Sequence, residues 1–110
     1  MLSLVIPAFN EEATVADAVK SAKRVVQENF DEPCEIVVVD DGSSDETAAR
    51  AEDAGARVIR HPHNTGYGQA LKSGILAAQH DTIVISDADG TYPIEELPKL
   101  VEMFNPAFPK

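Results

Sequence analysis

The chain has 110 residues, of which 44% are hydrophobic and 25% charged, the length and composition of a single globular domain. This composition excludes disordered, collagen-like and fibrous proteins. The formal net charge of −10 argues against nucleic acid and anionic lipid as partners, because both are bound through lysine and arginine. Apolar runs reach only four or five residues, so we expect no membrane-spanning helix. We also expect no secretory signal and, with Cys34 as the single cysteine, no internal disulfide.

Strands and helices are predicted to alternate along the chain. The Val/Ile run 36–39 is typical of a strand buried on both faces, and apolar side chains at helical spacing follow the first strand. The pattern predicts strands over residues 2–6, 35–40, 56–60 and 82–86. It predicts helices over residues 11–29, 46–54, 66–79 and 93–104.

Local signals mark the ends of these elements. Pro7 is expected to end the first strand and Asn10 to cap the first helix. Ser43 with Glu46 matches a capping box, and Gly55 is typical of a helix C-terminus. The alternation predicts an α/β fold with a mainly parallel sheet and helices on both faces. We expect one domain over residues 1–110, without a linker.

Acidic side chains follow three of the predicted strands. Glu11 follows the first, Asp40 and Asp41 end the second, and Asp87 and Asp89 follow the fourth. Ligands of open α/β sheets bind beyond the carboxyl ends of the strands, so we expect these carboxylates to converge. Like charges held close together are costly unless a cation joins them. The spacing of Asp87 and Asp89 suits a divalent ion, Mg²⁺ or Mn²⁺, that also holds phosphates. The alternative is that Asp87 caps a turn and Asp89 is solvated.

Four segments together carry a resemblance. They are Leu-Val-Ile-Pro-Ala-Phe-Asn-Glu-Glu at 4–12, Val-Val-Val-Asp-Asp-Gly-Ser-Ser-Asp-Glu-Thr at 37–47, Asn-Thr-Gly-Tyr-Gly-Gln-Ala-Leu at 64–71 and Asp-Ala-Asp-Gly-Thr-Tyr-Pro at 87–93. In this order and spacing the chain resembles the Rossmann-like, nucleotide-binding half of a family 2 glycosyltransferase with the GT-A fold. Within that family it is most similar to the polyprenyl-phosphate (dolichol-phosphate) mannosyl- and glucosyltransferases.

The resemblance implies a site for a nucleotide sugar, a GDP- or UDP-hexose. The residues that it places there are Pro7, Ala8, Phe9, Glu11, Val39, Asp41, Asp87, Ala88 and Asp89. Phe9 would pack against the nucleoside, and Asp41 would accept hydrogen bonds from the base or ribose, while Asp40 braces its loop. Asp87 and Asp89 would bind the metal, which neutralises the diphosphate.

The sequence departs from the family at two points. Thr91 stands where the polyprenyl-phosphate branch often has a glutamine that binds the metal. The acceptor half of the family, with the carboxylate expected to act as general base in an inverting transfer, is expected beyond residue 110. We therefore expect a donor-binding part, either a fragment or a short gene product. A cytoplasmic location is expected, with the full-length protein peripheral to the membrane as a second option.

Two other function classes stay open at this point. One is a non-catalytic nucleotide- or partner-binding module that retains the fold. The other is a phosphoacceptor regulator, although such domains have their acidic pair after the first strand and their acceptor after the third. A sheet without its later strands would also leave an edge open, which predicts a homo-oligomer.

Several smaller features are interpreted conservatively. Glycines at 66, 68 and 74 lower helix propensity, so we expect them to allow close packing on the sheet, with a ligand-facing role as the alternative for Gly68. His61 and His63 lack a third ligand at suitable spacing for a metal site. Ser43 and its neighbour Ser44 are expected to be helix caps, since no His–Asp pair points to a nucleophilic serine.

Overall fold

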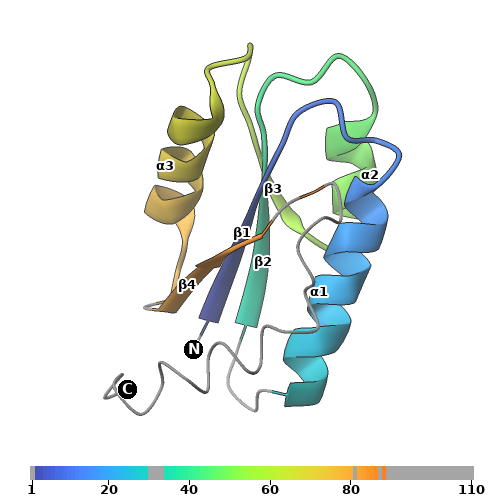
Figure 1. Cartoon of the computed structure of the whole chain (residues 1–110), viewed down its shortest axis with the longest axis vertical. Coiled ribbons are helices and arrows are strands. Elements are labelled where there is room, and N and C mark those ends of the chain that lie inside the picture. The colour runs from blue at the N-terminus through green and yellow to red at the C-terminus, as the bar shows by residue number, and fades with distance from the viewer. Residues whose placement is uncertain (1, 30–33, 81, 87, 89–110) are drawn as a thin grey trace.

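The computed structural model describes residues 2–29, 34–80, 82–86 and 88. Its elements, in chain order, are β1 (Leu2–Ala8), α1 (Val15–Asn29), β2 (Cys34–Asp40), α2 (Thr47–Asp53), β3 (Arg57–Arg60), α3 (Tyr67–Ala77) and β4 (Thr82–Ile85). The predicted fold class is confirmed, because all the described strand pairs are parallel and the helices cover both faces of the sheet (Figure 1). The predicted helix over 93–104 lies outside the described residues.

The strand order is β3-β2-β1-β4. The first strand is therefore central, with the second and fourth beside it. A receiver-like regulator has its first strand between the second and the third, so the topology excludes that hypothesis.

Side chains of the strands alternate between two cores. On one face, Leu4, Ile6 and Val38 pack with Val15 and Val19 of α1. The opposite face carries a smaller core under α3, formed by Val5, Val37, Val39 and Ala70. The strand residues named here are fully buried, and residues 36–39 are buried as predicted. In Figure 1, α1 and α2 lie on the right of the sheet and α3 on the left.

The strand β1 continues through Pro7, where the sequence predicted its end. Pro7 is in register with Val39 of β2. The carbonyl of Val5 accepts a hydrogen bond from Ser86 N at 3.0 Å, so Val5, and Pro7 two residues on, direct their backbone groups toward β4. β4 ends at Ile85, opposite Val5. Because the described ladder stops there, the missing N–H of Pro7 removes no pairing.

The predicted helix ends are right at one position and wrong at two. Gly55 follows α2, where Gly55 N donates to Glu52 O and Ala56 N to Ala51 O, the bonding of a Schellman motif. The predicted capping box is wrong, because α2 begins at Thr47 and its cap residue makes no side-chain cap bond. The predicted cap at residue 10 is also wrong, since α1 begins at Val15.

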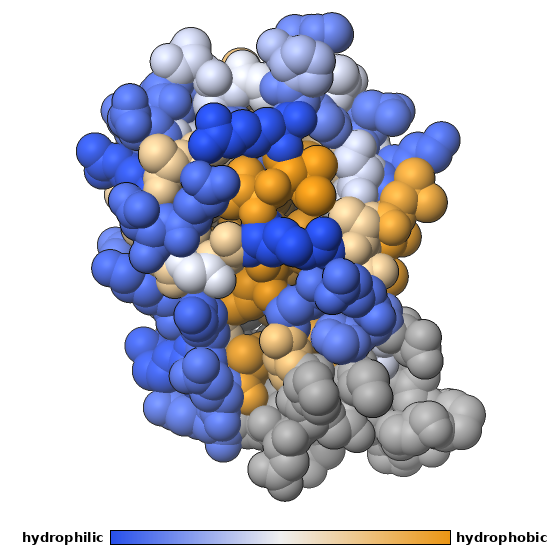
Figure 2. All heavy atoms as spheres, turned by 180° about the vertical axis from the view of Figure 1, so that it is seen from behind, coloured by the Kyte–Doolittle hydropathy of each residue, from blue (hydrophilic) through white to orange (hydrophobic). Residues whose placement is uncertain are grey.

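β3 forms one edge of the described sheet. Its apolar residues Val58 and Ile59 are only partly buried, whereas Arg57 and Arg60 at its two ends are exposed. Figure 2 shows apolar surface on the back of the molecule, crossed by strongly hydrophilic side chains. Charged side chains at an edge oppose pairing with a second sheet. Within the described ranges, every helix is too short or too polar to cross a bilayer.

Candidate functional site

Three loops meet at the carboxyl ends of β1, β2 and β3. They span residues 9–14, 41–46 and 61–66, and lie together at the top of Figure 1. The register pairs Ala8 with Asp40, and Asp40 with Arg60. Residues that follow these three strands are thus brought side by side, whereas the sequence predicted convergence after the first, second and fourth strands.

Side chains rather than secondary structure join the first two loops. Asn10 N donates to Ser43 Oγ at 2.8 Å, and Ser44 N donates to Asn10 Oδ1 at 2.9 Å. Glu11 N donates to Thr47 Oγ1 at 2.8 Å. Ser43 and Ser44 thus link two loops instead of capping a helix. Asn10 adopts a φ of 52°, a conformation that asparagine tolerates, to make these contacts.

The two neighbouring aspartates at the end of β2 serve different parts of the structure. Asp40 Oδ1 accepts a hydrogen bond from Ser43 N at 3.0 Å, so it braces its own loop, as expected. Asp41 accepts hydrogen bonds at Oδ1 from Thr65 N (3.0 Å) and Thr65 Oγ1 (2.7 Å), and at Oδ2 from Gly66 N (2.9 Å). Asp41 therefore fixes the start of α3.

A histidine completes the surroundings of Asp41. His61 Nδ1 lies 2.7 Å from Asp41 Oδ1, and His61 Nε2 lies 2.8 Å from Ser73 Oγ. Burial alone raises the pKa of Asp41, but the hydrogen bonds from His61, Thr65 and Gly66 outweigh it and lower the pKa from 3.8 to about 2. Asp41 is thus ionised at neutral pH and bound on several sides by donors.

This His–Asp pair was missed from the sequence. His61 was considered only as a metal ligand, and a His–Asp pair only as support for a nucleophilic Ser43 or Ser44. A signal was available, since parallel strands ending at residues 40 and 60 bring positions 41 and 61 together. Using it required the strand order as well as the strand positions.

The residues in and directly after β1 and β2 that were predicted to bind the nucleotide differ in solvent exposure. Phe9 is 44% exposed, so its ring is available to a ligand, and Glu11 is partly buried at the start of the same loop. Pro7 and Ala8 are buried in the strand. Val39 is fully buried beneath α3, which leaves its backbone rather than its side chain for any ligand contact.

The segment with the two predicted metal ligands is described only at its middle residue. Ala88 is buried, and its carbonyl oxygen accepts a hydrogen bond from Thr14 Oγ1 at 2.7 Å. Asp87 and Asp89 lie outside the described residues. The part of the chain that the structure describes contains no group of three or more His, Cys, Asp or Glu side chains placed to hold a metal. The contact with Thr14 nevertheless joins this segment to the loop after β1.

Glycines allow two close approaches near these loops. A Cβ on Gly42, whose φ is +80°, would lie 2.3 Å from the backbone carbonyl carbon of His63. One on Gly74 would lie 2.4 Å from Val5 Cγ1, so the packing predicted for this glycine is confirmed. Gly66 and Gly68 are different, because a Cβ on either would meet no atom within 4 Å. The packing explanation is therefore wrong for both.

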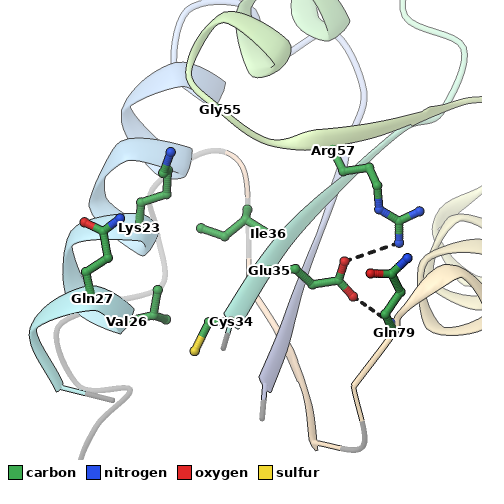
Figure 3. Close-up of a pocket in the computed structure, with 9 residues that line it drawn as sticks. All are labelled: Lys23, Val26, Gln27, Cys34, Glu35, Ile36, Gly55, Arg57 and Gln79. Atoms are coloured by element: carbon green, nitrogen blue, oxygen red, sulfur yellow. Dashed lines mark hydrogen bonds and ion pairs between the residues drawn. The ribbon is translucent and has the colours of Figure 1, made fainter. Parts of the chain in front are cut away.

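A hollow of about 540 Å³ lies at the opposite, amino-terminal end of the strands. Figure 3 shows Cys34 and Ile36 pointing toward α1, and Glu35 pointing the other way, toward Arg57 and Gln79. Glu35 Oε2 accepts hydrogen bonds from Ser3 Oγ and Gln79 N, both at 2.6 Å. Burial on its own raises the pKa of Glu35, but these bonds and Arg57 lower it overall. In this hollow Glu35 thus binds both Arg57 and Gln79.

Comparison with known proteins identifies the family. The sequence matches glycosyl transferase family 2 over residues 3–107. The chain belongs to this family. The resemblance seen in the four segments is thereby confirmed, and the match covers nearly the whole chain.

Relatives of this chain are named for the transfer of different sugars. The dolichyl-phosphate hexose transferase of Haloferax volcanii is 36% identical over 107 residues, which are 97% of this chain and 44% of that protein. The undecaprenyl-phosphate 4-deoxy-4-formamido-L-arabinose transferase of Sodalis glossinidius is 37% identical over 108 residues, covering 93% of this chain and 33% of that protein. The chain thus spans less than half the length of these relatives.

Solved structures of similar proteins have the same arrangement. Glucosyl-3-phosphoglycerate synthase of Mycobacterium tuberculosis superposes with a TM-score of 0.76 at 36% identity, over 92% of this chain and 39% of the synthase. Its complex with Mn²⁺, UDP and phosphoglyceric acid gives a TM-score of 0.75 at 33% identity, over 93% and 38% of the two chains. The described sheet and helices are thus the Rossmann-like part of a GT-A glycosyltransferase fold.

Proposed function

We propose that this chain is the donor-binding part of a metal-dependent, inverting glycosyltransferase. Its ligand is a nucleotide-diphosphate hexose, a UDP- or GDP-sugar, and the acceptor of the whole enzyme is a polyprenyl phosphate. The relatives that act on dolichyl and undecaprenyl phosphate support the acceptor class. The neighbour in complex with UDP and Mn²⁺ supports the donor class.

One observation carries the proposal: segments far apart in sequence converge at the carboxyl ends of the strands. Exposed Phe9 belongs to the loop after β1, and Asp41 directly follows β2. Ala88, between the two predicted metal ligands, is held by Thr14 of the first loop. An aromatic ring, an ionised carboxylate and an acidic motif at one edge suit a nucleoside with its diphosphate.

The acidic motif fits a divalent cation. Ala88 is buried and hydrogen-bonded, so Asp87 and Asp89 flank an anchored residue. Both are hard oxygen ligands, the kind that Mg²⁺ and Mn²⁺ prefer. When bound, the ion would offset the charge of the diphosphate and of the departing nucleotide. An acidic chain of net charge −10 needs such an ion to hold an anionic ligand.

The chain's own residues would bind and orient the donor. Phe9 would pack on the nucleoside, with Glu11 and the backbone of Pro7, Ala8 and Val39 forming the surrounding wall. The Ala88 backbone would lie near the ribose. We place acceptor binding and the general base in the part of the relatives that this chain does not match. We accordingly propose that residues 1–110 form one donor-binding domain with no transfer activity of its own.

We also propose assembly and location. Leu76 of α3 is 76% exposed and Ile85 at the end of β4 is 40% exposed, which supports a homo-oligomer. Light scattering that gives a monomeric mass at high concentration would contradict it. The relatives that use lipid phosphates support a cytoplasmic protein that works at the membrane surface.

The donor site is tested by thermal unfolding with UDP or GDP, each with and without Mn²⁺. A nucleotide at a hundred times its Kd adds about 2.7 kcal/mol to the folded state, which raises Tm on the order of 10 °C for a domain of this size. The expected shift requires nucleotide and metal together, and Asp87→Ala or Asp89→Ala abolishes it. A shift that needs no metal favours a non-catalytic binding module instead. No shift with either nucleotide rejects the donor site.

A further inference from the structure

A chain of hydrogen bonds connects α3 back to its own beginning. It runs from Ser73 Oγ to His61 Nε2 (2.8 Å) and from His61 Nδ1 to Asp41 Oδ1 (2.7 Å). From Asp41 it continues to the backbone amides of Thr65 and Gly66. The side chains of His61 and Asp41 are 13% and 5% exposed. This buried network thus closes a ring around the loop between β3 and α3.

The direction of each hydrogen bond follows from the chemistry of the partners. Ionised Asp41 only accepts, so Nδ1 of His61 must carry a proton. In the neutral ring Nε2 is then an acceptor, and the Ser73 hydroxyl donates to it. Ser73 lies inside α3, where backbone amides bond to carbonyls of the preceding turn and are not available to stabilise an oxyanion. The Asp–His–Ser order therefore orients groups and does not create a nucleophile.

The two oxygens of Asp41 are unequally occupied. Among the described residues, Oδ1 receives donors from His61 Nδ1, Thr65 N and Thr65 Oγ1, whereas Oδ2 receives only Gly66 N. A carboxylate oxygen has two lone pairs, so Oδ1 is fully used and Oδ2 retains one. Of the side chains that bind Oδ1, His61 makes a contact of 2.7 Å and is itself held by Ser73.

We propose that His61 is a positioning residue for the donor nucleotide, acting through Asp41. It holds Oδ1 against the loop, so that Oδ2 is directed to the base or ribose. It also fixes Thr65 and Gly66, and with them the amino-terminal end of α3. The inference rests on the proposed function, because it assumes that Asp41 contacts the nucleotide.

Two substitutions separate the two nitrogens of the ring. In His61→Asn the side-chain amide can replace Nδ1 and still donate to Asp41. In His61→Gln the longer side chain reaches the place of Nε2 and loses that donor. Ser73→Ala removes only the outer support. His63→Ala is the matched control, since the side chain of His63 is exposed in the same loop.

The first measurement is the Kd of each variant for UDP and for GDP with Mn²⁺, by calorimetry. We expect His61→Gln to weaken binding about tenfold, the size of one hydrogen bond to a charged group. His61→Asn should stay within about threefold of the wild type and Ser73→Ala should lose about threefold, since a neutral hydrogen bond is weaker. His63→Ala should bind like the wild type. Equal affinity of His61→Gln and His61→Asn overturns the proposal.

The second measurement is amide hydrogen exchange of Thr65 and Gly66 by NMR, without nucleotide. We expect faster exchange in His61→Gln and near wild-type exchange in His61→Asn. If the wild type binds neither nucleotide, the proposed function fails, yet this exchange still decides whether His61 orders the loop. Unchanged exchange in His61→Gln overturns the positioning role. If His61→Gln does not fold, Ser73→Ala against His63→Ala gives the same test with a smaller change.

Discussion

Glu35, near the start of β2, and Asp41, which directly follows β2, each bind one end of α3. Asp41 receives the amides of Thr65 and Gly66 before the helix. Glu35 receives the amide of Gln79 after it. Both ends of α3 are thus stabilised in the same way, by a carboxylate that accepts hydrogen bonds from backbone N–H groups.

The two carboxylates differ in their other partners. Glu35 pairs with Arg57, 3.3 Å away, and lies at the amino ends of the strands. Asp41 pairs with His61 and lies where three loops converge. In open α/β sheets, ligands bind at the carboxyl ends of the strands, where Asp41 lies, and not at the amino ends. The comparison indicates that a buried carboxylate is a functional candidate because of its place in the topology, not because of its hydrogen bonds alone.

The largest expected effect comes from Asp41→Ala. It leaves His61 and two backbone amides without their acceptor, and we expect a loss of about 3 kcal/mol in the free energy of unfolding. Urea denaturation measures this loss, and calorimetry should show that nucleotide binding is lost in the folded fraction. If Asp41→Ala kept the wild-type affinity for nucleotide, Asp41 would be no more important for binding than Glu35 at the amino ends of the strands.

A methyl group under α3 is expected to have the next largest effect. Gly74→Ala places a Cβ 2.4 Å from Val5 Cγ1, and overpacking of this kind costs about 2 kcal/mol. Gly68→Ala is the control, since its Cβ meets nothing and alanine is favoured in a helix by up to about 1 kcal/mol. Thermal unfolding should therefore give shifts of opposite sign. Stabilisation by both substitutions would show that α3 is free to move off the sheet.

Acid should weaken the hydrogen bonds that Asp41 accepts at the start of α3. The folded-state pKa of Asp41 is lowered from 3.8 to about 2, so the ionised form stabilises the fold above pH 4. This contribution, about 2 kcal/mol, is lost as pH falls from about 4 to about 2. Urea denaturation across this range should show the decline in the wild type and a smaller decline in Asp41→Asn. Identical pH profiles would contradict the assigned pKa.

The smallest effect is expected at Glu35. Arg57 is 41% exposed in its side chain, and such pairs contribute about 1 kcal/mol or less. We expect Glu35→Gln, which keeps one acceptor oxygen, to lower the free energy of unfolding by about 1 kcal/mol. Its nucleotide affinity should equal that of the wild type. A loss of affinity would mean that the amino-terminal end also serves the site.

The sequence was sufficient for the order of elements because the buried strands have clear patterns. The run 36–39 is apolar on both faces, and Gly55 stops a helix by a local rule. The predicted helix starts near Asn10 and Ser43 were wrong because the Ser43 hydroxyl accepts a hydrogen bond from the backbone N–H of Asn10, 33 residues away in sequence. A local capping signal carries no information about such a partner.

The candidate site was predictable in its location but not in its connections. Asp40 was expected to brace its loop, and it does so through Ser43. The network of Asp41, His61 and Ser73 depends on three elements meeting in space. Spacing along the chain showed none of this, because each residue alone has an ordinary local explanation.

The most direct test is an NMR titration of the full chain with UDP and, separately, GDP, in the presence of Mg²⁺. We expect one nucleotide to shift the amide signals of Phe9, Asp41, Gly66 and Ala88, at the carboxyl ends of the strands. The signals of Glu35, Arg57 and Gln79 at the other end should stay in place. Shifts confined to those last three residues, or no shift with either nucleotide, would contradict the account.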